Sequence, residues 1–429
     1  MSQAESLDKI SLRYGNDLID WDLSGDVVLF DVRDPKSRCD PERFFLQAGQ
    51  AIDSARPDLS RVGIVVADKT RLCNYPIYLP RLMEAFEKRG IDSGRIRFFI
   101  AYSTHARQSD AESFVAYGEV YRRFTFIHHD GSNPDSFALL GETSRKIPVL
   151  MRKDLLECTF VLTFGAISHH YFAGYGGGRK LIFPGLGFRE AVYLNHALFL
   201  DRAEKRLAPG CRPGVLDGNP LAEDLEEHEA FFQAHMAIHG ILDRNGKVCE
   251  LIFGAGPSDF RKACAEHARN CELPDGKRYS WVLASCGGHP RDINFIQSHK
   301  AIQNASLFVE DGGTLVALAR CRDGVGSSTF LPYFSMEGFA GAFERLSMRY
   351  EGNGGTALSM MTKTARIRII MITDLDEKTC RIIGVKKVSH NQALRYIQNR
   401  KGAMAVLPNA GLLVRVPKGP VHGIRSKDR

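Results

Sequence analysis

Apolar and polar positions along this chain form blocks typical of alternating strands and helices. Short apolar runs predict strands at residues 27–32, 62–67, 96–101, 124–128 and 158–165. Segments with helical spacing of apolar residues accompany them at 42–55, 80–89 and 110–121. Because strands and helices alternate, the pattern predicts parallel sheets covered by helices.

The pattern begins a second time after the polar stretch 272–277. An amphipathic region at 225–241, a strand at 248–253 and a helix at 259–271 precede this stretch, and strands at 280–284, 313–319, 366–372, 380–385 and 403–407 follow it. A chain of 429 residues exceeds the usual size of one domain. We therefore predict two α/β domains with mainly parallel, Rossmann-like sheets and an interdomain active-site cleft. Residues 1–276 would form the N-terminal domain, to which 404–429 would return, and 277–403 the C-terminal domain.

Composition excludes several classes of protein. Charged residues make up 25% and hydrophobic residues 44%, and no apolar run is long enough to cross a bilayer. The first residues lack the pattern of a secretory signal, and the ten cysteines lack the spacing of a zinc site or a disulfide framework. We expect a cytoplasmic protein that binds neither membrane nor nucleic acid. Its net charge of +7 is compatible with a small anionic substrate.

The stretch from Ser168 to His196 concentrates the reactive side chains. It follows a buried strand and reads SHHYFAGYGGGRKLIFPGLGFREAVYLNH, with three histidines and an Arg-Lys pair among glycines. Open α/β sheets bind ligands at the carboxyl ends of their strands. Arg71 and His105 also follow predicted strands, and Gln297 and Lys300 lie on a predicted helix after a strand. This shared placement predicts one small-molecule site.

The glycine-rich segment does not match the familiar nucleotide-binding loops. In GYGGGRKL, Arg179 separates the last glycine from Lys180 and Leu181 follows, so the segment departs from a Walker A loop. The spacing of a dinucleotide-binding GxGxxG is also missing. A glycine-rich connection with a solvated lysine is the plain structural alternative.

Several motifs together resemble the lactate racemase family, whose members carry a nickel-pincer nucleotide. These are a strand followed by Thr-His, an HxxxGxGGGxK block with Pro-Gly three residues later, Asn-His downstream, GGHPxDIN followed by QxxK, and CxDGxG. The resemblance covers nearly the whole chain, and the motifs occur in the family's order.

The resemblance implies a cofactor and the residues that hold it. Lys180 would be joined covalently to a pyridinium mononucleotide whose sulfurs and one ring carbon bind a single Ni(II). His196 would supply the remaining metal ligand, in agreement with the preference of nickel for imidazole and sulfur donors. The cofactor-binding residues further include Gly176, Gly177, Gly178, Pro184 and Asp68. Dedicated synthesis enzymes would be the partners that mature the protein.

The resemblance also implies a reaction, the racemisation or epimerisation of a 2-hydroxy acid at carbon 2 with transient hydride transfer to the cofactor. His105 and His170 would be the paired acid and base, a role suited to histidine. The spacing to Lys180 favours His170 over His169. Arg71, Gln297 and Lys300 would bind the substrate carboxylate, although charged loop residues are often only solvated.

One departure from the family bears on the substrate. After His105 the chain reads Ala106-Arg107-Gln108-Ser109, where the lactate enzymes more usually carry Arg-Pro and then Thr. We therefore expect a 2-hydroxy acid bulkier than lactate. The alternatives are a degenerate family member that binds a nucleotide or metabolite, and a nicotinamide-dependent dehydrogenase, which the poor GxGxxG match disfavours.

Overall fold

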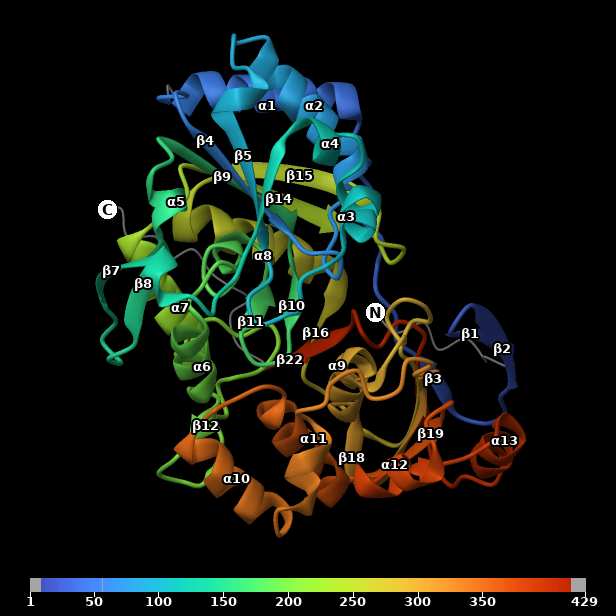
Figure 1. Ribbon diagram of the computed structural model, residues 1–429. Helices are drawn as coiled ribbons and strands as arrows, with labels where there is room; N and C mark the ends of the chain where they lie inside the picture. The colour runs from blue at the N-terminus through green and yellow to red at the C-terminus, as the bar shows by residue number, and fades with distance from the viewer. Residues whose placement is uncertain (1–8, 56, 418–429) are drawn as a thin grey trace, which may run out of the picture. The chain divides into compact units, whose positions relative to one another are not determined.

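The computed structural model describes residues 9–55 and 57–417, which form two compact units (Figure 1). The first, here called the Lys180 unit, contains residues 33–198 and 215–270. The second, here called the terminal unit, contains residues 9–32, Phe199–Gly214 and the described residues from Cys271 onward. In the described part of the chain, no helix is long and apolar enough to cross a membrane.

A six-stranded sheet in the order β15-β14-β9-β4-β5-β6 forms the centre of the Lys180 unit (Figure 1). Its strands are β4 (Val62–Ala67), β5 (Ile96–Ala101), β6 (Thr125–His128), β9 (Phe160–Ala166), β14 (Met236–Leu242) and β15 (Val248–Gly254). All neighbours are parallel except the antiparallel edge pair β14 and β15. Every residue of β4 is buried, as expected when both faces of a parallel sheet are covered.

Helices and short hairpins surround this sheet. The helices are α1 (Pro41–Ala55), α2 (Tyr75–Glu87), α3 (Asp110–Tyr117), α4 (Val120–Arg123), α5 (Lys153–Leu156), α6 (Arg189–Ala197), α7 (Pro220–Phe231) and α8 (Gly256–Cys271). The hairpins are β7 (Phe137–Glu142) with β8 (Pro148–Arg152), and β10 (Ser168–His170) with β11 (Gly174–Gly176). Phe44 of α1 and Phe86 of α2 are buried with Val65 of β4 in one apolar core. This core fixes the strand ends from which the site loops start.

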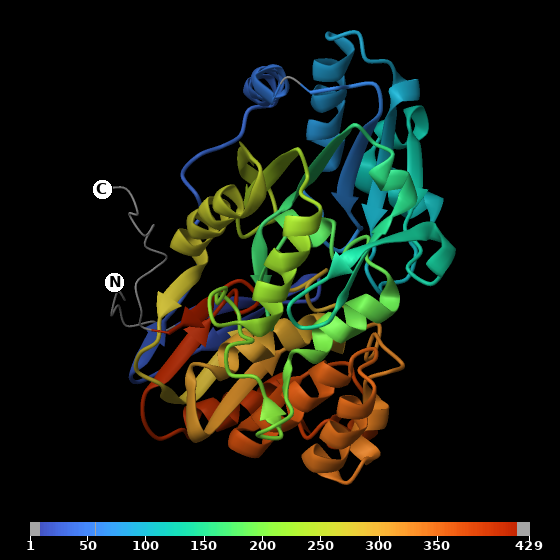
Figure 2. The same cartoon turned by 90° about the vertical axis from the view of Figure 1, so that its left-hand side faces the viewer.

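The terminal unit has its own six-stranded sheet, in the order β20-β19-β18-β17-β21-β3, and all its pairs are parallel. Its strands are β3 (Val27–Leu29), β17 (Tyr279–Ser285), β18 (Val309–Leu318), β19 (Arg368–Ile372), β20 (Lys386–Lys387) and β21 (Met404–Leu407). Figure 2 shows the gold, orange and red segments of this unit from a second direction.

Helices and small strand pairs complete the terminal unit. The helices are α9 (Phe295–Ser306), α10 (Gly338–Met348), α11 (Gly354–Arg366), α12 (Glu377–Ile382) and α13 (His390–Gln398). The pairs are β1 (Lys9–Tyr14) with β2 (Asp17–Asp22), β12 (Leu200–Asp201) with β13 (Arg206–Leu207), and β16 (Glu272–Pro274) with β22 (Val414–Val416). Trp21 from β2 is fully buried in the same core as Leu283 of β17 and Val406 of β21. The hairpin β1–β2 therefore contributes to this core.

The two α/β units agree with the predicted fold class, but the predicted assignment of the chain ends is wrong. Residues 404–417 do not return to the first domain, because β21 pairs with β17 and with β3 inside the terminal unit. Residues 9–32 also belong to the terminal unit rather than to the N-terminal domain. The rest of the expected return, residues 418–429, lies outside the described residues.

Two local predictions also differ from the structure. The segment Cys380–Val385, predicted as a strand, begins in α12 and continues in a turn after Ile382; the N-cap of α12, Asp376, accepts a hydrogen bond from the Thr379 amide. The amphipathic region 225–241 divides into the end of α7 and the buried strand β14.

Candidate active site

His105 follows β5 and is held by a carboxylate that follows β4. The Nδ1 atom of His105 lies 2.6 Å from Oδ2 of Asp68, which is 2% exposed. The other carboxylate oxygen of Asp68 accepts hydrogen bonds from the amide and hydroxyl of Thr70, at 2.7 and 2.6 Å. Despite burial, the hydrogen bond and charge of His105, together with Arg71, hold the pKa of Asp68 well below its usual value. An ionised Asp68 favours the ring proton on Nδ1, which leaves the lone pair of a neutral ring on Nε2.

Gln108 joins the two loops that carry these residues. Its side-chain oxygen accepts a hydrogen bond from the Lys69 amide at 2.8 Å, and its amide group donates to Ser113 Oγ at 3.0 Å. Gln108 is 1% exposed, whereas Ala106 and Arg107 before it are exposed. Of the four residues in the sequence departure after His105, Gln108 is therefore buried, and Ala106, Arg107 and Ser109 are exposed.

His170 ends the first strand of the β10–β11 hairpin. Its Nδ1 accepts a hydrogen bond from the Ala173 amide at 3.2 Å, so a neutral His170 ring carries its proton on Nε2. His105 has the opposite arrangement. One histidine is thus prepared to accept a proton at Nε2 and the other to donate one.

The neighbouring His169 has a different environment. Its Nδ1 lies 3.3 Å from Nε2 of His267 on α8, and its ring lies 5.1 Å from that of Tyr175. The structure therefore gives the two adjacent histidines different partners.

Lys180 lies in a 3₁₀ turn, Gly178–Leu181, that follows the hairpin. Gly177 before the turn has φ +82°, and a Cβ there would lie 2.3 Å from the carbonyl oxygen of Ala166. At Gly178, with φ +54°, a Cβ would lie 2.4 Å from the Phe260 ring. The space of both missing side chains is filled by the protein itself. These glycines are required by the turn, and their expected contact with a cofactor stays a prediction.

The segment after Lys180 is tied both to its own turn and to the His105 loop. The Gly185 amide donates to the carbonyl of Lys180 at 2.9 Å. The carbonyl of Gly185 accepts a hydrogen bond from the Ser103 amide at 2.7 Å, two residues before His105. Pro184, predicted to bind the cofactor, directly precedes Gly185, which makes both contacts.

The Lys180 residue is buried, with 9% of its surface exposed. Burial, and then the positive charges of Arg71 and Arg179, lower its pKa well below the ordinary value of lysine. An uncharged lysine amine is a nucleophile, so this side chain suits covalent attachment of a cofactor.

His196 on α6 has the properties of a metal ligand. Its Nδ1–H donates to the carbonyl of Val192 at 2.7 Å, which leaves the lone pair on Nε2. Burial and the charge of Lys180 lower the pKa of His196 to about 3, with smaller contributions from Arg71 and His105. The ring is therefore neutral at physiological pH. These mutual effects also show that Lys180, His196, Arg71 and His105 lie within electrostatic reach of one another.

The predicted substrate-binding pair lies on α9 of the terminal unit. Asn294 caps this helix by accepting from the Gln297 amide at 3.0 Å. Nζ of Lys300 donates to Oε1 of Gln297 at 2.7 Å. The structure thus brings Gln297 and Lys300 together on one helix turn, and their contact with a substrate stays a prediction.

The residues present fit a nickel-pincer nucleotide that supplies most of its own metal ligands. Within the described ranges, no group of three or more His, Cys, Asp or Glu side chains is placed to hold a metal ion. A buried lysine with a lowered pKa to hold the nucleotide and one neutral imidazole to hold nickel are both available, in Lys180 and His196.

Sequence reasoning missed the partners of these residues. It assigned Asp68 to the cofactor or the substrate, whereas Asp68 contacts His105, and it noted Gln108 only as a departure. Arg179, beside Lys180 in sequence, is only 7% exposed. From the sequence, this arginine counted only against a phosphate-binding loop. A charged residue inside an apolar glycine-rich block was the available signal for Arg179.

Comparisons with known proteins agree with the motif-based resemblance. Residues 47–208 match the family model of the lactate racemase N-terminal domain, and residues 275–409 match that of the lactate racemase C-terminal domain. Lactate racemase of Thermoanaerobacterium thermosaccharolyticum is 28% identical over 272 residues, which are 63% of this chain and 62% of the relative. Lactate racemase of Lactiplantibacillus plantarum is 25% identical over 275 residues, 62% of each chain. The matched region thus spans under two thirds of each curated relative.

Solved structures share the fold. The lactate racemase apoprotein from Thermoanaerobacterium thermosaccharolyticum superposes with a TM-score of 0.83 at 21% identity, covering 95% of this chain and 100% of that chain. A protein from Thermotoga maritima has a TM-score of 0.66 at 15% identity, covering 90% and 100%.

Proposed function

Because this chain belongs to the lactate racemase family, we propose that it is a racemase or epimerase that inverts carbon 2 of a 2-hydroxy acid. The observation that carries the proposal is the buried side chain of Lys180, whose pKa burial lowers, within electrostatic reach of His196 and near Arg71. Family membership supplies the reaction class, and the state of Lys180 supports a covalent cofactor.

Lys180 would hold a nickel-pincer nucleotide, and His196 would bind its nickel through Nε2. When bound, this group supplies the hydride acceptor that inversion at carbon 2 requires. The pKa of Lys180 is lowered toward the uncharged amine that attachment needs, and His196 is neutral at physiological pH.

The two histidines would move the proton of the substrate hydroxyl. His105, with Asp68 on its Nδ1, would accept this proton at Nε2, and His170 would donate from Nε2. For the opposite enantiomer the roles exchange. Arg71 would bind the carboxylate beside these residues, with Gln297 and Lys300 of α9 as the further carboxylate ligands.

The substrate would be bulkier than lactate. Support comes from the loop after His105, where the small, exposed Ala106 stands at the position at which the lactate enzymes more usually carry arginine. A panel of 2-hydroxy acids differing in chain length and charge, assayed by hydrogen exchange at carbon 2, tests this part of the proposal. Fastest exchange on lactate would contradict it.

Mass analysis of protein produced together with the cofactor-synthesis enzymes tests the central claim. We expect a mass adduct on Lys180 and one nickel per chain. Unmodified Lys180 and no nickel would refute the proposal and leave a binding protein as the alternative. His196→Ala should lose nickel and keep the adduct, whereas His105→Ala and His170→Ala should keep both and lose turnover.

A further inference from the structure

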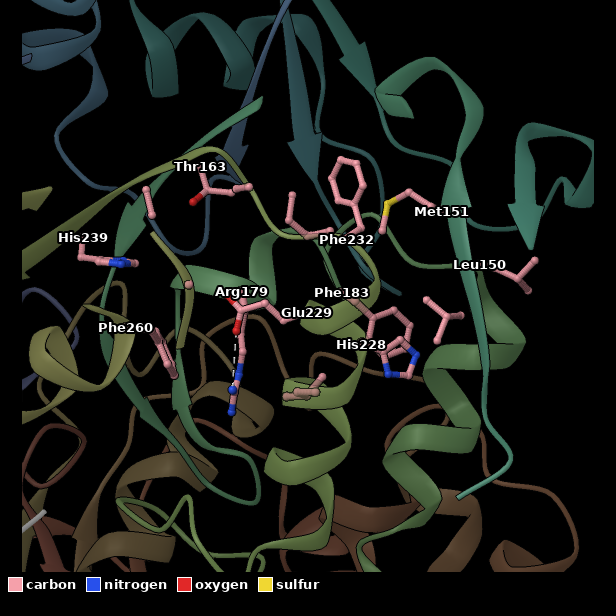
Figure 3. Close-up of a pocket in the computed structure, with 16 residues that line it drawn as sticks. Leu150, Met151, Thr163, Arg179, Phe183, His228, Glu229, Phe232, His239 and Phe260 are labelled. Atoms are coloured by element: carbon pink, nitrogen blue, oxygen red, sulfur yellow. Dashed lines mark ion pairs between the residues drawn. The ribbon is translucent and has the colours of Figure 1, made fainter. Parts of the chain in front are cut away.

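Arg179, the residue before Lys180, is buried and takes part in a partly buried ionic network. Its side chain is 3% exposed. It donates hydrogen bonds to the carbonyl of Ala222 at 2.9 Å and to Oε2 of Glu226 at 3.0 Å, both on α7. Glu229 of the same helix lies 3.7 Å from the guanidinium. Figure 3 shows Arg179 and Glu229 joined by this ion pair, with Phe260 nearby.

The network extends to a second helix. Arg261 of α8 also binds Oε2 of Glu226, at 3.0 Å. The guanidinium of Arg179 lies 5.0 Å from the ring centroid of Phe260, another α8 residue. The Phe260 ring also occupies the space of the side chain that Gly178 lacks. The turn Gly178–Leu181 is therefore held between α7 and α8 by one arginine and one aromatic ring.

Stability alone is a weak explanation for this arrangement. Removing two charges from water is costly, and apolar residues of similar volume often replace a buried ion pair without loss of stability. The surrounding pocket is not fully satisfied either. Among the described residues, Oε2 of Glu229 and both ring nitrogens of His239 have no hydrogen-bond partner. Arginine does, however, offer a planar fork that fixes direction as well as charge.

We propose that Arg179 is a positioning residue that anchors the turn Gly178–Leu181 to α7 and thereby aims the side chain of Lys180 for attachment of the cofactor. Adjacent residues of a 3₁₀ turn point in different directions, so a fixed Arg179 determines the direction left for Lys180. The inference rests on the proposed function for the attachment and on geometry alone for the anchoring.

The chain contains a matched control for this arginine. Arg145 also binds two glutamates of α7, with Glu223 at 2.6 Å and Glu227 at 3.0 Å. Its side chain is more exposed, at 28%, and it lies on the β7–β8 hairpin connection rather than in the lysine turn. Arg145→Met removes the same kind of contact to α7 and leaves the turn untouched.

The test compares Arg179→Met, Arg179→Lys and Arg145→Met in the full chain. Hydrogen exchange of the peptide spanning residues 177–186 in protein made without cofactor measures the order of the turn. Intact mass of protein made with the synthesis enzymes measures the fraction of chains carrying the adduct. We expect Arg179→Met to exchange at least about tenfold faster in this peptide and to lose most of the adduct. Arg179→Lys should be intermediate, and Arg145→Met should match the wild type in both readouts.

A folded Arg179→Met protein with wild-type exchange and a full adduct would overturn the proposal. Where Arg179→Met does not fold, the double variant Arg179→Met/Glu229→Gln removes the carboxylate left without its cation, and the same two outcomes decide. Should the double variant also not fold, Glu226→Gln removes the carboxylate that accepts a hydrogen bond from Arg179 and leaves Arg179 in place. The same exchange and adduct measurements then decide.

Failure of the proposed function gives a different result. Wild-type protein without any adduct would refute covalent cofactor attachment, whereas the exchange comparison between Arg179→Met and Arg145→Met would still decide whether Arg179 anchors the turn.

Discussion

Asp68 uses its two carboxylate oxygens for different purposes, one for His105 and one for Thr70. Asp68→Asn removes the charge that keeps the His105 proton on Nδ1, and an amide in its place can hold the other tautomer. We expect kcat to fall by about 10²-fold or more, the usual contribution of a general base. Steady-state kinetics on the best substrate of the panel measures this, with the Lys180 adduct unchanged.

A second aspartate provides the control for the turn that Asp68 makes. Asp130 accepts hydrogen bonds from the amide and hydroxyl of Ser132, at 2.8 and 2.6 Å, as Asp68 does from Thr70. No hydrogen bond between the Asp130 carboxylate and a histidine is found among the described residues. Asp130→Asn should therefore leave kcat within about twofold. Equal losses in the two variants would assign the effect to the turn.

At the scale of residues, sequence motifs indicate candidate side chains for the chemistry but not the partners of these side chains. His105, Lys180 and His196 occur at family spacing and are brought within electrostatic reach in the structure. The partner of His105 is Asp68, 37 positions earlier, and that of Arg179 is Glu226, 47 positions later. Such pairs depend on strand order and helix packing, which a single sequence does not display.

At the scale of elements, the hairpin β10–β11 and the lysine turn depend on a left-handed glycine. Gly177→Ala adds a Cβ 2.3 Å from the Ala166 carbonyl at φ +82°. Gly218 has nearly the same φ, +76°, and open space around it. We expect Gly218→Ala to cost about 1–2 kcal/mol of unfolding free energy, the backbone cost alone. Gly177→Ala should cost about 2 kcal/mol more because of the clash. Urea denaturation of both variants separates the two effects, and equal losses would contradict the clash.

Sequence patterns identified the buried strands of the parallel sheets better than the short elements near their edges. The runs at β4, β5, β6 and β9 are apolar and bounded by polar loops, and each forms a strand. The segment Cys380–Val385 is as apolar, but six residues fit either a strand or a helix turn. Its helical state follows from the cap at Asp376.

At the scale of the whole molecule, the course of the chain predicts which fragments fold. Residues 33–270 contain the complete sheet and core of the Lys180 unit. We expect this fragment to unfold cooperatively on heating, as followed by circular dichroism. A fragment of 277–429 lacks β3 and buried Trp21, so it should not. Cooperative unfolding of the second fragment would contradict the described core.

Buried neutral histidines predict acid sensitivity. Burial and nearby Arg152 lower the pKa of His129 to about 4, and burial lowers that of His239 to about 4. In the unfolded chain these rings become protonated near pH 6.5. Above this pH, the neutral rings therefore do not reduce the free energy of unfolding. It falls by about 1.4 kcal/mol per pH unit for each ring as pH decreases toward 4. His239→Leu should remove one such contribution, and an unchanged slope in denaturation between pH 6.5 and 5 would contradict this.

The domain boundary could not be predicted from composition, because polarity marks a linker but not the sheet that a strand joins. The stretch 272–277 does lie near the point where the chain enters the terminal unit at Cys271. The strands β3 and β21, however, are both short apolar runs that fit either sheet. They pair with each other, although 374 or more residues separate β3 from β21 in sequence.

The pairing of β3 with β21 also determines when the sheet of the terminal unit can be completed during synthesis. Ribosomes add about 5–20 residues per second, so β3 waits tens of seconds before its neighbour in the sheet is made. The Lys180 unit ends at Asn270 and has all its strands long before that moment. Lys180 and the helices α7 and α8 are therefore complete while the polypeptide is still growing. Chaperones that shield an early, unpaired strand would act on β3.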